Sequence, residues 1–195
     1  MPCPILDLFN GVGEMVESNK NRRSIRLKNY DYSKPGYYFL TICSFKKRCL
    51  FGKIEGNQVL LSQIGKVIEK CWNDIPRHFP TTAMDQCTVM PKHIHGILVI
   101  NRFRRGEACL APTPDEEPKT GLSNIVASFK SAVSKRVNEL RGTQGESVWQ
   151  RNYYEHVVRD EGDLYKIREY ISNNPLQWAL DEENPDFSGL KMLPL

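Results

Sequence analysis

The chain has 195 residues, which is enough for one domain with short appendages, and its 40% hydrophobic and 26% charged content excludes a largely disordered protein. It holds no apolar run of membrane-spanning length, and residues 1–15 lack the features of a signal peptide, so we expect a cytoplasmic protein without a membrane partner. The net charge of +4 permits nucleic-acid binding, and the six scattered cysteines argue against a disulfide framework or a cysteine zinc site.

Residues 1–28 show no clear period and are predicted to be a tail that ends in a basic arm. Five positive charges lie within the nine residues 20–28. Such a run is usually a solvated charged surface, but it can also neutralise phosphates. In the second interpretation its contacts with DNA are Arg22, Arg23, Arg26 and Lys28.

The predicted domain covers residues 29–178 and begins with a turn followed by an aromatic, β-branched strand at 37–45. Short apolar runs on both sides of Gly56-Asn57 predict a hairpin. Ser62 is expected to cap an amphipathic helix, whose apolar residues recur at helical spacing and point to the core.

Two more strands are predicted at 84–90 and 93–100, joined by a Pro91-Lys92 turn. Residues 102–120 then break the pattern with arginines, prolines and acidic residues, which predicts a flexible surface loop inserted in the domain. A long amphipathic helix follows over 122–140 and ends at the glycines after it.

Residues 148–159 are predicted to begin as a loop and become a strand. Asp163 is expected to cap a final helix that Pro175 stops, and residues 179–195 form a predicted C-terminal tail. The order strand, helix, strand, strand, helix, strand, helix predicts an α+β fold. A ferredoxin-like antiparallel sheet with helices packed on it fits this order best.

His93 and His95 lie two residues apart in the strand predicted at 93–100. Residues i and i+2 of a strand share a face, so the two imidazoles can lie side by side and bind a divalent metal ion. Gly96 would leave room for a close approach by backbone or ligand. Most His-x-His pairs are ordinary strand residues, so a site also needs a third ligand and a reactive group.

The final helix offers both groups, because Tyr170 and Asn174 are four residues apart and therefore lie one turn apart on one face. If this face covers the histidines, Asn174 would complete a site for Mg²⁺ or Mn²⁺, and Tyr170 would supply a phenolic nucleophile. A helical tyrosine is more often a packed core residue. Three other tyrosines also compete as nucleophiles: Tyr153, Tyr154 and Tyr165.

Five sequence blocks stand in order and at plausible spacing along the chain. They are Tyr32-x-x-Pro35-Gly36-x-Tyr38-Phe39-x-Thr41-Ile42-Cys43, Met90-Pro91-x-His93-Ile94-His95-Gly96, Ser128-Phe129-Lys130-Ser131, Trp149-Gln150-Arg151-x-Tyr153-Tyr154-x-His156 and Arg168-x-Tyr170-Ile171-x-x-Asn174-Pro175. These blocks resemble the REP-associated tyrosine transposases, which are single-tyrosine members of the HUH nuclease superfamily. The resemblance runs from about residue 24 to residue 185. One block alone would be weak, but five together are highly specific.

The resemblance implies an HUH nuclease fold and an enzyme that cuts and rejoins single-stranded DNA near palindromic hairpins. By similarity, Tyr170 is the nucleophile that becomes joined to a 5′-phosphate, His93 and His95 are the metal pair, and Asn174 is the third ligand. Lys92 departs from the family, in which Asn usually precedes the first histidine. The local turn or a DNA contact is therefore expected to differ there, while His156 is expected to be structural or to contact DNA.

Basic residues outside the arm extend the predicted DNA-binding surface. They are Lys92, Arg102, Arg104, Arg105, Lys130, Arg136 and Arg151. A catalytically inactive hairpin-binding protein of the same fold is the alternative function, and a domain with structural zinc is weaker because two histidines leave a tetrahedral shell unfilled. The sequence is compatible with a monomer and with a homodimer that exchanges the tyrosine helix, and it does not specify which hairpin is recognised.

Overall fold

The computed structural model describes Leu27, residues 29–101, residues 121–178 and Asn184. The predicted basic arm, the predicted loop insertion and most of the C-terminal tail lie outside the described residues. So do seven predicted DNA contacts: Arg22, Arg23, Arg26, Lys28, Arg102, Arg104 and Arg105. The described helices and strands all fall within the predicted domain at 29–178, whose boundaries stay a prediction.

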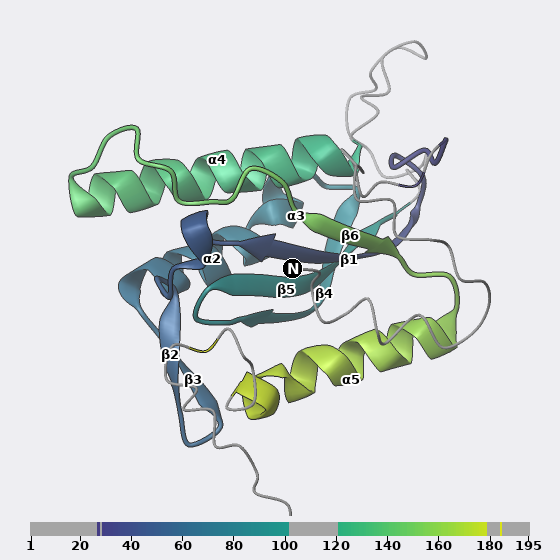
Figure 1. Cartoon of the computed structure of the whole chain (residues 1–195). Helices are drawn as coiled ribbons and strands as arrows, with labels where there is room; N and C mark the ends of the chain where they lie inside the picture. Colours follow the sequence, from purple (N-terminus) through teal and green to yellow (C-terminus); the bar gives the residue numbers. More distant parts are fainter. Residues whose placement is uncertain (1–26, 28, 102–120, 179–183, 185–195) are drawn as a thin grey trace, which may run out of the picture.

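The described part of the chain contains a four-stranded antiparallel sheet with the strand order β4-β5-β1-β6 (Figure 1). Its strands are β1 (Gly36–Cys43), β4 (Thr82–Val89), β5 (His93–Ile100) and β6 (Tyr154–Val157). With a helical connection after β1 and another after β5, this is the strand order of a ferredoxin-like βαββαβ fold. The predicted α+β class is therefore confirmed.

Helices cover both faces of this sheet (Figure 1). On one side lie α2 (Gln63–Asn73), α3 (Ile75–His78) and α4 (Leu122–Arg141), and on the other side lies α5 (Glu161–Gln177). Between β1 and α2 the chain forms the 3-10 helix η1 (Phe45–Lys47) and a ribbon of β2 (Gly52–Glu55) and β3 (Gln58–Leu61). The hairpin predicted at Gly56-Asn57 is confirmed, since these residues have φ of 54° and 67°, as a tight two-residue turn requires.

The helix ends test the predicted caps. Ser62 caps α2 as predicted, because its side chain accepts a hydrogen bond from the Gly65 amide at 3.1 Å. The prediction for α5 was wrong at both ends. Asp160 is the cap, and its side chain accepts from the amide of Asp163 at 2.8 Å. The helix also continues through Pro175 to Gln177, since a proline in the last turn removes only one intrahelical hydrogen bond.

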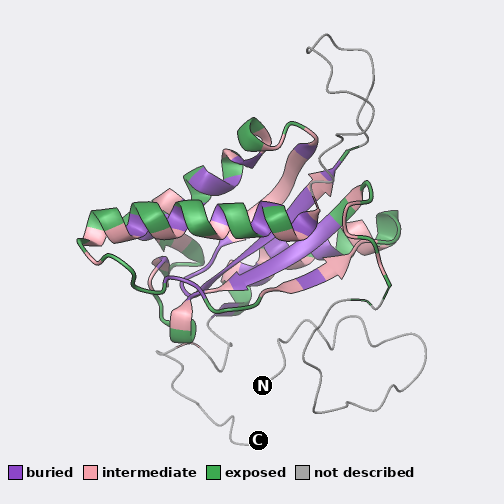
Figure 2. Ribbon diagram, turned by 90° about the horizontal axis from the view of Figure 1, so that it is seen from above, coloured by how far each residue is buried: buried purple, intermediate pink, exposed green. Residues whose placement is uncertain are grey.

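The larger core lies between the sheet and the helices α2 and α4 (Figure 2). Alternate residues of β1 and β5, such as Leu40 and Ile94, point into it and meet the apolar stripes of the helices. A Cβ atom on Gly96 would come within 2.3 Å of Cζ2 of Trp72. The prediction that backbone or a ligand approaches Gly96 was therefore wrong, because the group beside it is the side chain of a core tryptophan of α2.

A smaller core lies on the other face of the sheet. Phe39 of β1 and Ile97 of β5 pack there against Ile167 and Ile171 of α5. The alternation that turns Ile94 toward α2 and α4 turns the odd-numbered residues of β5 toward α5. Both histidines of β5 therefore lie on the sheet face that α5 covers.

Candidate active site

His93 and His95 lie side by side on the sheet face under α5, as predicted. Their ring centroids are 4.4 Å apart with the planes inclined at 63°. Both are buried, with 8% of His93 and 1% of His95 exposed. Burial is the main cause that holds the pKa of His95 well below its usual value, and the charge interaction with His93 lowers it further. His95 is therefore neutral at pH 7, as a metal-binding or hydrogen-bond-accepting imidazole must be.

Thr41 fixes the orientation of the second imidazole. It is the direct cross-strand neighbour of His95, and its Oγ1 lies 2.9 Å from His95 Nδ1. Phe39, two residues before Thr41 on the same strand face, stacks on the His95 ring at 5.6 Å between centroids. With Nδ1 engaged by the threonine, His95 directs Nε2 toward α5.

Tyr170 of α5 meets that nitrogen. Its hydroxyl oxygen lies 3.5 Å from His95 Nε2, and the two ring centroids are 5.2 Å apart. Phe39 supports the tyrosine ring edge-on, at 6.2 Å and 89°. The oxygen is thus beside the imidazole at a distance longer than an ordinary hydrogen bond.

Asn174 lies on the sheet-facing side of α5. It is 9% exposed and, with Ile167 and Ile171, forms the buried stripe of the helix at spacings of four and three residues. Its amide oxygen is a metal ligand of the type that hard cations accept. Helix α5 therefore brings Tyr170 and Asn174 to the face that holds the two histidines, which is the arrangement that the sequence required.

The rival tyrosines are placed differently. Tyr165 is 68% exposed, away from the sheet. Tyr153 packs against the larger core. Tyr154 is the nearest rival, because it lies across from Thr41 on β6 and packs beside Phe39.

Polar contacts along α5 fix it to three parts of the sheet. His156 of β6 contacts Asp163 with 2.8 Å between Nε2 and Oδ2, which agrees with the structural role expected for this histidine. Further along the helix, Asp85 and Gln86 of β4 contact Arg168 and Ser172. Lys92, in the turn before β5, contacts Trp178 at the C-terminal end of the helix.

Lys92 does not fit its predicted role as a DNA contact. It is only 3% exposed, and its ammonium lies 4.9 Å from the ring centroid of Trp178, at the C-terminal end of α5. A buried ammonium over an aromatic face is held by a cation–π contact and is not available to a phosphate. The departure from the family at this position thus contributes to helix docking.

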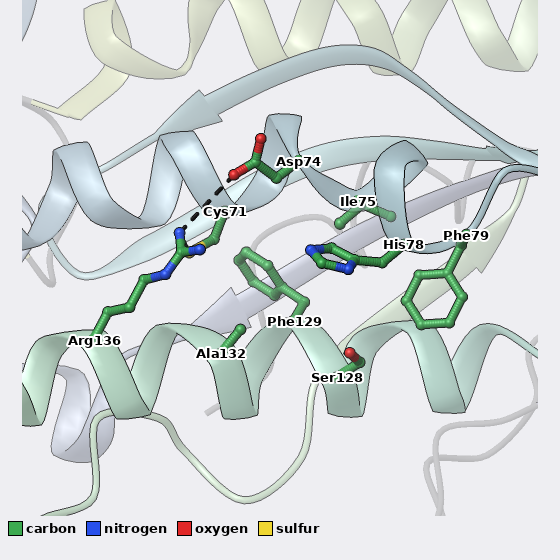
Figure 3. Close-up of a pocket in the computed structure, with 9 residues that line it drawn as sticks. All are labelled: Cys71, Asp74, Ile75, His78, Phe79, Ser128, Phe129, Ala132 and Arg136. Carbon is green, nitrogen blue, oxygen red and sulfur yellow. Dashed lines mark hydrogen bonds and ion pairs between the residues drawn. The ribbon is translucent and has the colours of Figure 1, made fainter.

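Lys130 and Arg136 on α4 make contacts within the protein, and their contacts with DNA stay predictions. The Lys130 ammonium donates to the carbonyls of Gln150 and Arg151 at 2.6 and 3.2 Å, and burial lowers its pKa. Arg136 donates to Cys71 Sγ at 3.1 Å and lies 3.9 Å from Asp74 (Figure 3). The side chains drawn in Figure 3 line a cavity beside Arg136, on the sheet face opposite the histidines. Its volume of about 30 Å³ leaves room for little more than a water molecule. Arg151 is exposed, and its DNA contact stays a prediction.

Two kinds of feature are absent from the described residues. None of their helices is long and apolar enough to cross a membrane. They hold no group of three or more His, Cys, Asp or Glu residues that would suit a metal ion, and the third ligand expected here is the amide of Asn174.

A further residue, Thr41, was not predicted for the site. A polar side chain inside an aromatic strand was its one signal in the sequence.

No protein-family model matches the chain. Among curated proteins, an uncharacterized protein of Haemophilus influenzae is 40% identical over 168 residues, which span 83% of this chain and 92% of the relative. A second protein of the same organism, provisionally assigned to the REP-associated tyrosine transposases, is 24% identical over 167 residues, which span 83% of each chain.

Two solved structures are also similar to the chain. A REP-associated tyrosine transposase bound to a REP hairpin has 18% sequence identity and a TM-score of 0.49, and the match covers 78% of this chain and 73% of that one. A protein of Deinococcus radiodurans, provisionally classed as a transposase, has 17% identity and a TM-score of 0.43, with coverage of 76% and 95%.

The sequence relatives and the motifs show together what the chain is similar to. The relative at 40% identity is matched over almost its whole length, and the relative at 24% carries the family name. The blocks that resemble this family contain the residues that the fold brings together: His93, His95, Tyr170 and Asn174. The chain belongs to one family with the Haemophilus influenzae protein at 40% identity, and it is similar to the REP-associated tyrosine transposases.

Proposed function

We propose that this chain is a metal-dependent transposase that cuts and rejoins single-stranded DNA near palindromic hairpins through a 5′-phosphotyrosine intermediate. One observation carries the proposal: the Tyr170 hydroxyl lies 3.5 Å from Nε2 of His95, on the face that also holds His93. The relative provisionally named a REP-associated tyrosine transposase supports transposase activity and DNA as the partner.

The residues at the site fit a divalent cation. His93 and His95 are adjacent, buried imidazoles, and the low pKa of His95 leaves it neutral for coordination. Thr41 engages Nδ1 of His95, which is the usual way a second group orients a metal-binding histidine. The imidazoles of His93 and His95 and the amide oxygen of Asn174 would hold Mg²⁺ or Mn²⁺. When bound, the ion would act as a Lewis acid on a phosphodiester oxygen.

Tyr170 provides the covalent chemistry in this proposal. Its oxygen forms a bond to phosphorus while the bond from phosphorus to the 3′ oxygen breaks. The phenol loses a proton to water, and the departing 3′ oxygen gains one. A free 3′-OH then attacks the phosphotyrosine in the second step, which restores the phenol and rejoins the DNA.

The position of the tyrosine on a helix suits this role. A phenol has a pKa near 10 and is a weak nucleophile at neutral pH, so accurate placement must supply much of the rate. Side chains on helices and strands are held more accurately than those on loops. Phe39 supports the Tyr170 ring, and buried Ile167 and Ile171 flank it on α5.

The test is adduct formation with single-stranded palindromic oligonucleotides and Mg²⁺, followed on a denaturing gel. The Tyr170→Phe variant should keep the fold, the metal and hairpin binding but form no adduct, because only a hydroxyl is removed. Tyr165→Phe, on the exposed side of the same helix, is the matched control and should react like the wild type. Mass spectrometry should place the DNA on the peptide containing residues 167–174.

Two outcomes would contradict the proposal. An adduct on Tyr154 or Tyr153, or full activity in Tyr170→Phe, would move the chemistry to another residue. Hairpin binding by the wild type without an adduct in Mg²⁺ or Mn²⁺ would support the alternative, an inactive hairpin-binding protein of the same fold.

A further inference from the structure

Strand β4 contains a bulge beneath α5. Met84 pairs with Leu98 and Cys87 pairs with Gly96, so β4 advances three residues where β5 advances two. The extra residue places both Asp85 and Gln86 opposite a single residue of β5. In a regular strand these neighbours would point to opposite faces. Here both side chains reach α5, Asp85 by contacting Arg168 and Gln86 by contacting Ser172.

The contact between Asp85 and Arg168 is bidentate. Arg168 Nε donates to Oδ1 at 3.0 Å, and Nη2 donates to Oδ2 at 2.5 Å. A fork of this kind fixes direction as well as distance. Arg168 also holds the pKa of the Asp85 carboxyl below its usual value, so the carboxylate stays ionised at neutral pH.

The contacts of Asp85 with Arg168 and of Gln86 with Ser172 are here called the clamp. The clamped residues of α5, Arg168 and Ser172, lie on the opposite flank of the helix from Tyr170. At about 100° per residue, Arg168 and Ser172 are on one side of the ridge formed by Ile167 and Ile171, and Tyr170 is on the other. The ridge rests on the sheet, with β4 under the clamped flank and His95 of β5 under the tyrosine. Any rotation of the helix about its axis would therefore move the phenol oxygen.

The apolar contacts under α5 are few, and they resist such a rotation weakly. The small core holds four buried residues, and hydrophobic attraction has no preferred direction. At a side-chain radius of about 6 Å, a rotation of about 10° would shift the phenol oxygen by roughly 1 Å. Misplacement of a reacting group by that distance can slow a reaction about 100-fold.

We propose that Asp85 and Arg168, assisted by Gln86 and Ser172, are positioning residues that set the rotation of α5 and hold the Tyr170 oxygen against the histidine pair. This inference rests on the proposed function, because it assigns the clamp to the tyrosine chemistry. The bulge in β4 is the feature of the fold that makes the clamp possible.

The experiment compares Asp85→Asn and Arg168→Gln with the wild type, with Arg77→Gln as matched control. Arg77 lies 3.7 Å from Asp74 in a single ion pair on the other side of the sheet, so this control loses an ion pair away from α5. Single-turnover adduct formation is measured with a saturating hairpin oligonucleotide and Mg²⁺, together with hairpin affinity and Tm. The clamp variants should slow adduct formation about 10- to 100-fold. Their hairpin affinity should be unchanged, and Tm should fall by no more than about 4 °C.

The exchanged pair Asp85→Arg/Arg168→Asp should recover part of the lost rate, and Arg77→Gln should lose none. A wild-type rate in Arg168→Gln would overturn the proposal. A loss of hairpin affinity with a wild-type rate at saturation would also overturn it, because Arg168 would then be a DNA contact.

A second readout separates this inference from the proposed function. The NMR shifts of the His95 ring protons report the position of the Tyr170 ring, whose centroid is 5.2 Å away. They should move in Arg168→Gln and stay fixed in Arg77→Gln, whether or not the protein reacts with DNA. Unchanged shifts in Arg168→Gln would reject the clamp, whereas moved shifts in a protein that forms no adduct would reject only the transposase chemistry.

Discussion

The two faces of the sheet are covered in different ways. Among the described residues, twenty-one that are buried form one continuous core under α2 and α4, whereas four form the core under α5. The α5 face instead carries polar groups, with Thr41, two histidines and the clamp from β4. One face holds most of the buried apolar surface that stabilises the fold, and the other gives up part of it to present reactive side chains.

This difference explains why α5 is fixed by directional contacts. Asp163 is held by His156 near its first turn, Arg168 by Asp85 near its middle, and Trp178 by Lys92 at its end. Each of these contacts fixes the position of α5 while burying little apolar surface. Substitutions under α5 should therefore mainly change reactivity, whereas substitutions under α2 and α4 should mainly change stability.

The largest expected effect is on the α5 face. Excess EDTA should abolish adduct formation while circular dichroism stays unchanged, and added Mg²⁺ or Mn²⁺ should restore the reaction. His93→Ala and His95→Ala should likewise form no adduct and bind the hairpin almost normally, because the two imidazoles would hold the metal. Cleavage that persists in excess EDTA would remove the metal from the mechanism.

The opposite result is expected at Gly96, whose Cα faces the larger core. In Gly96→Ala the new Cβ would meet Trp72 Cζ2 at 2.3 Å, a distance that requires the indole or the strand to move. Overpacking of this kind typically costs 1–3 kcal/mol, and we expect about 3 kcal/mol here because backbone and a large ring are involved. Chemical denaturation measures the loss. A fully stable Gly96→Ala protein would show that this core adapts more easily than its packing indicates.

Periodicity predicted the elements and the shared face of the histidines, because strand and helix repeats are local properties of the sequence. The sheet order followed from the few topologies that such a succession allows. The bulge at Asp85 and Gln86 could not be predicted, since it depends on how β4 registers against β5. The burial of Lys92 and the internal contacts of Lys130 and Arg136 could not be predicted for a related reason. Charge alone does not reveal that tertiary contacts bury or engage a cation.

A smaller effect on the α5 face is expected from Thr41→Val. The change keeps the shape of the side chain and removes the oxygen that lies 2.9 Å from His95 Nδ1. Groups that orient a metal-binding histidine typically contribute a factor of about 10 to 100 in metal affinity. Titration with Mn²⁺ should show such a loss, and equal affinity in both proteins would mean that Thr41 does not orient the ring.

The contact between Asp85 and Arg168 should also affect how the free energy of unfolding changes at low pH. Because Arg168 lowers the pKa of folded Asp85, the unfolded chain binds more protons at this group, and its stabilising contribution is present above the unfolded pKa. It is lost as the pH falls below about 4 and through the folded pKa. The difference in unfolding free energy between the wild type and Asp85→Asn should therefore shrink toward low pH. A difference that stays constant down to pH 2 would mean that the ion pair contributes nothing to stability.

The smallest expected effect separates exposed from engaged cations in DNA binding. Arg151 is exposed, whereas Arg136 is held by Cys71 and Asp74 on the face under α2 and α4. If Arg151 contacts a phosphate, Arg151→Ala should flatten the dependence of log affinity on log salt by about 0.7, the value for one contact with single-stranded DNA. Arg136→Ala should leave that slope unchanged. Equal slopes for Arg151→Ala and the wild type would remove Arg151 from the interface, and a flatter slope in Arg136→Ala would mean that the helix α4 face binds DNA after all.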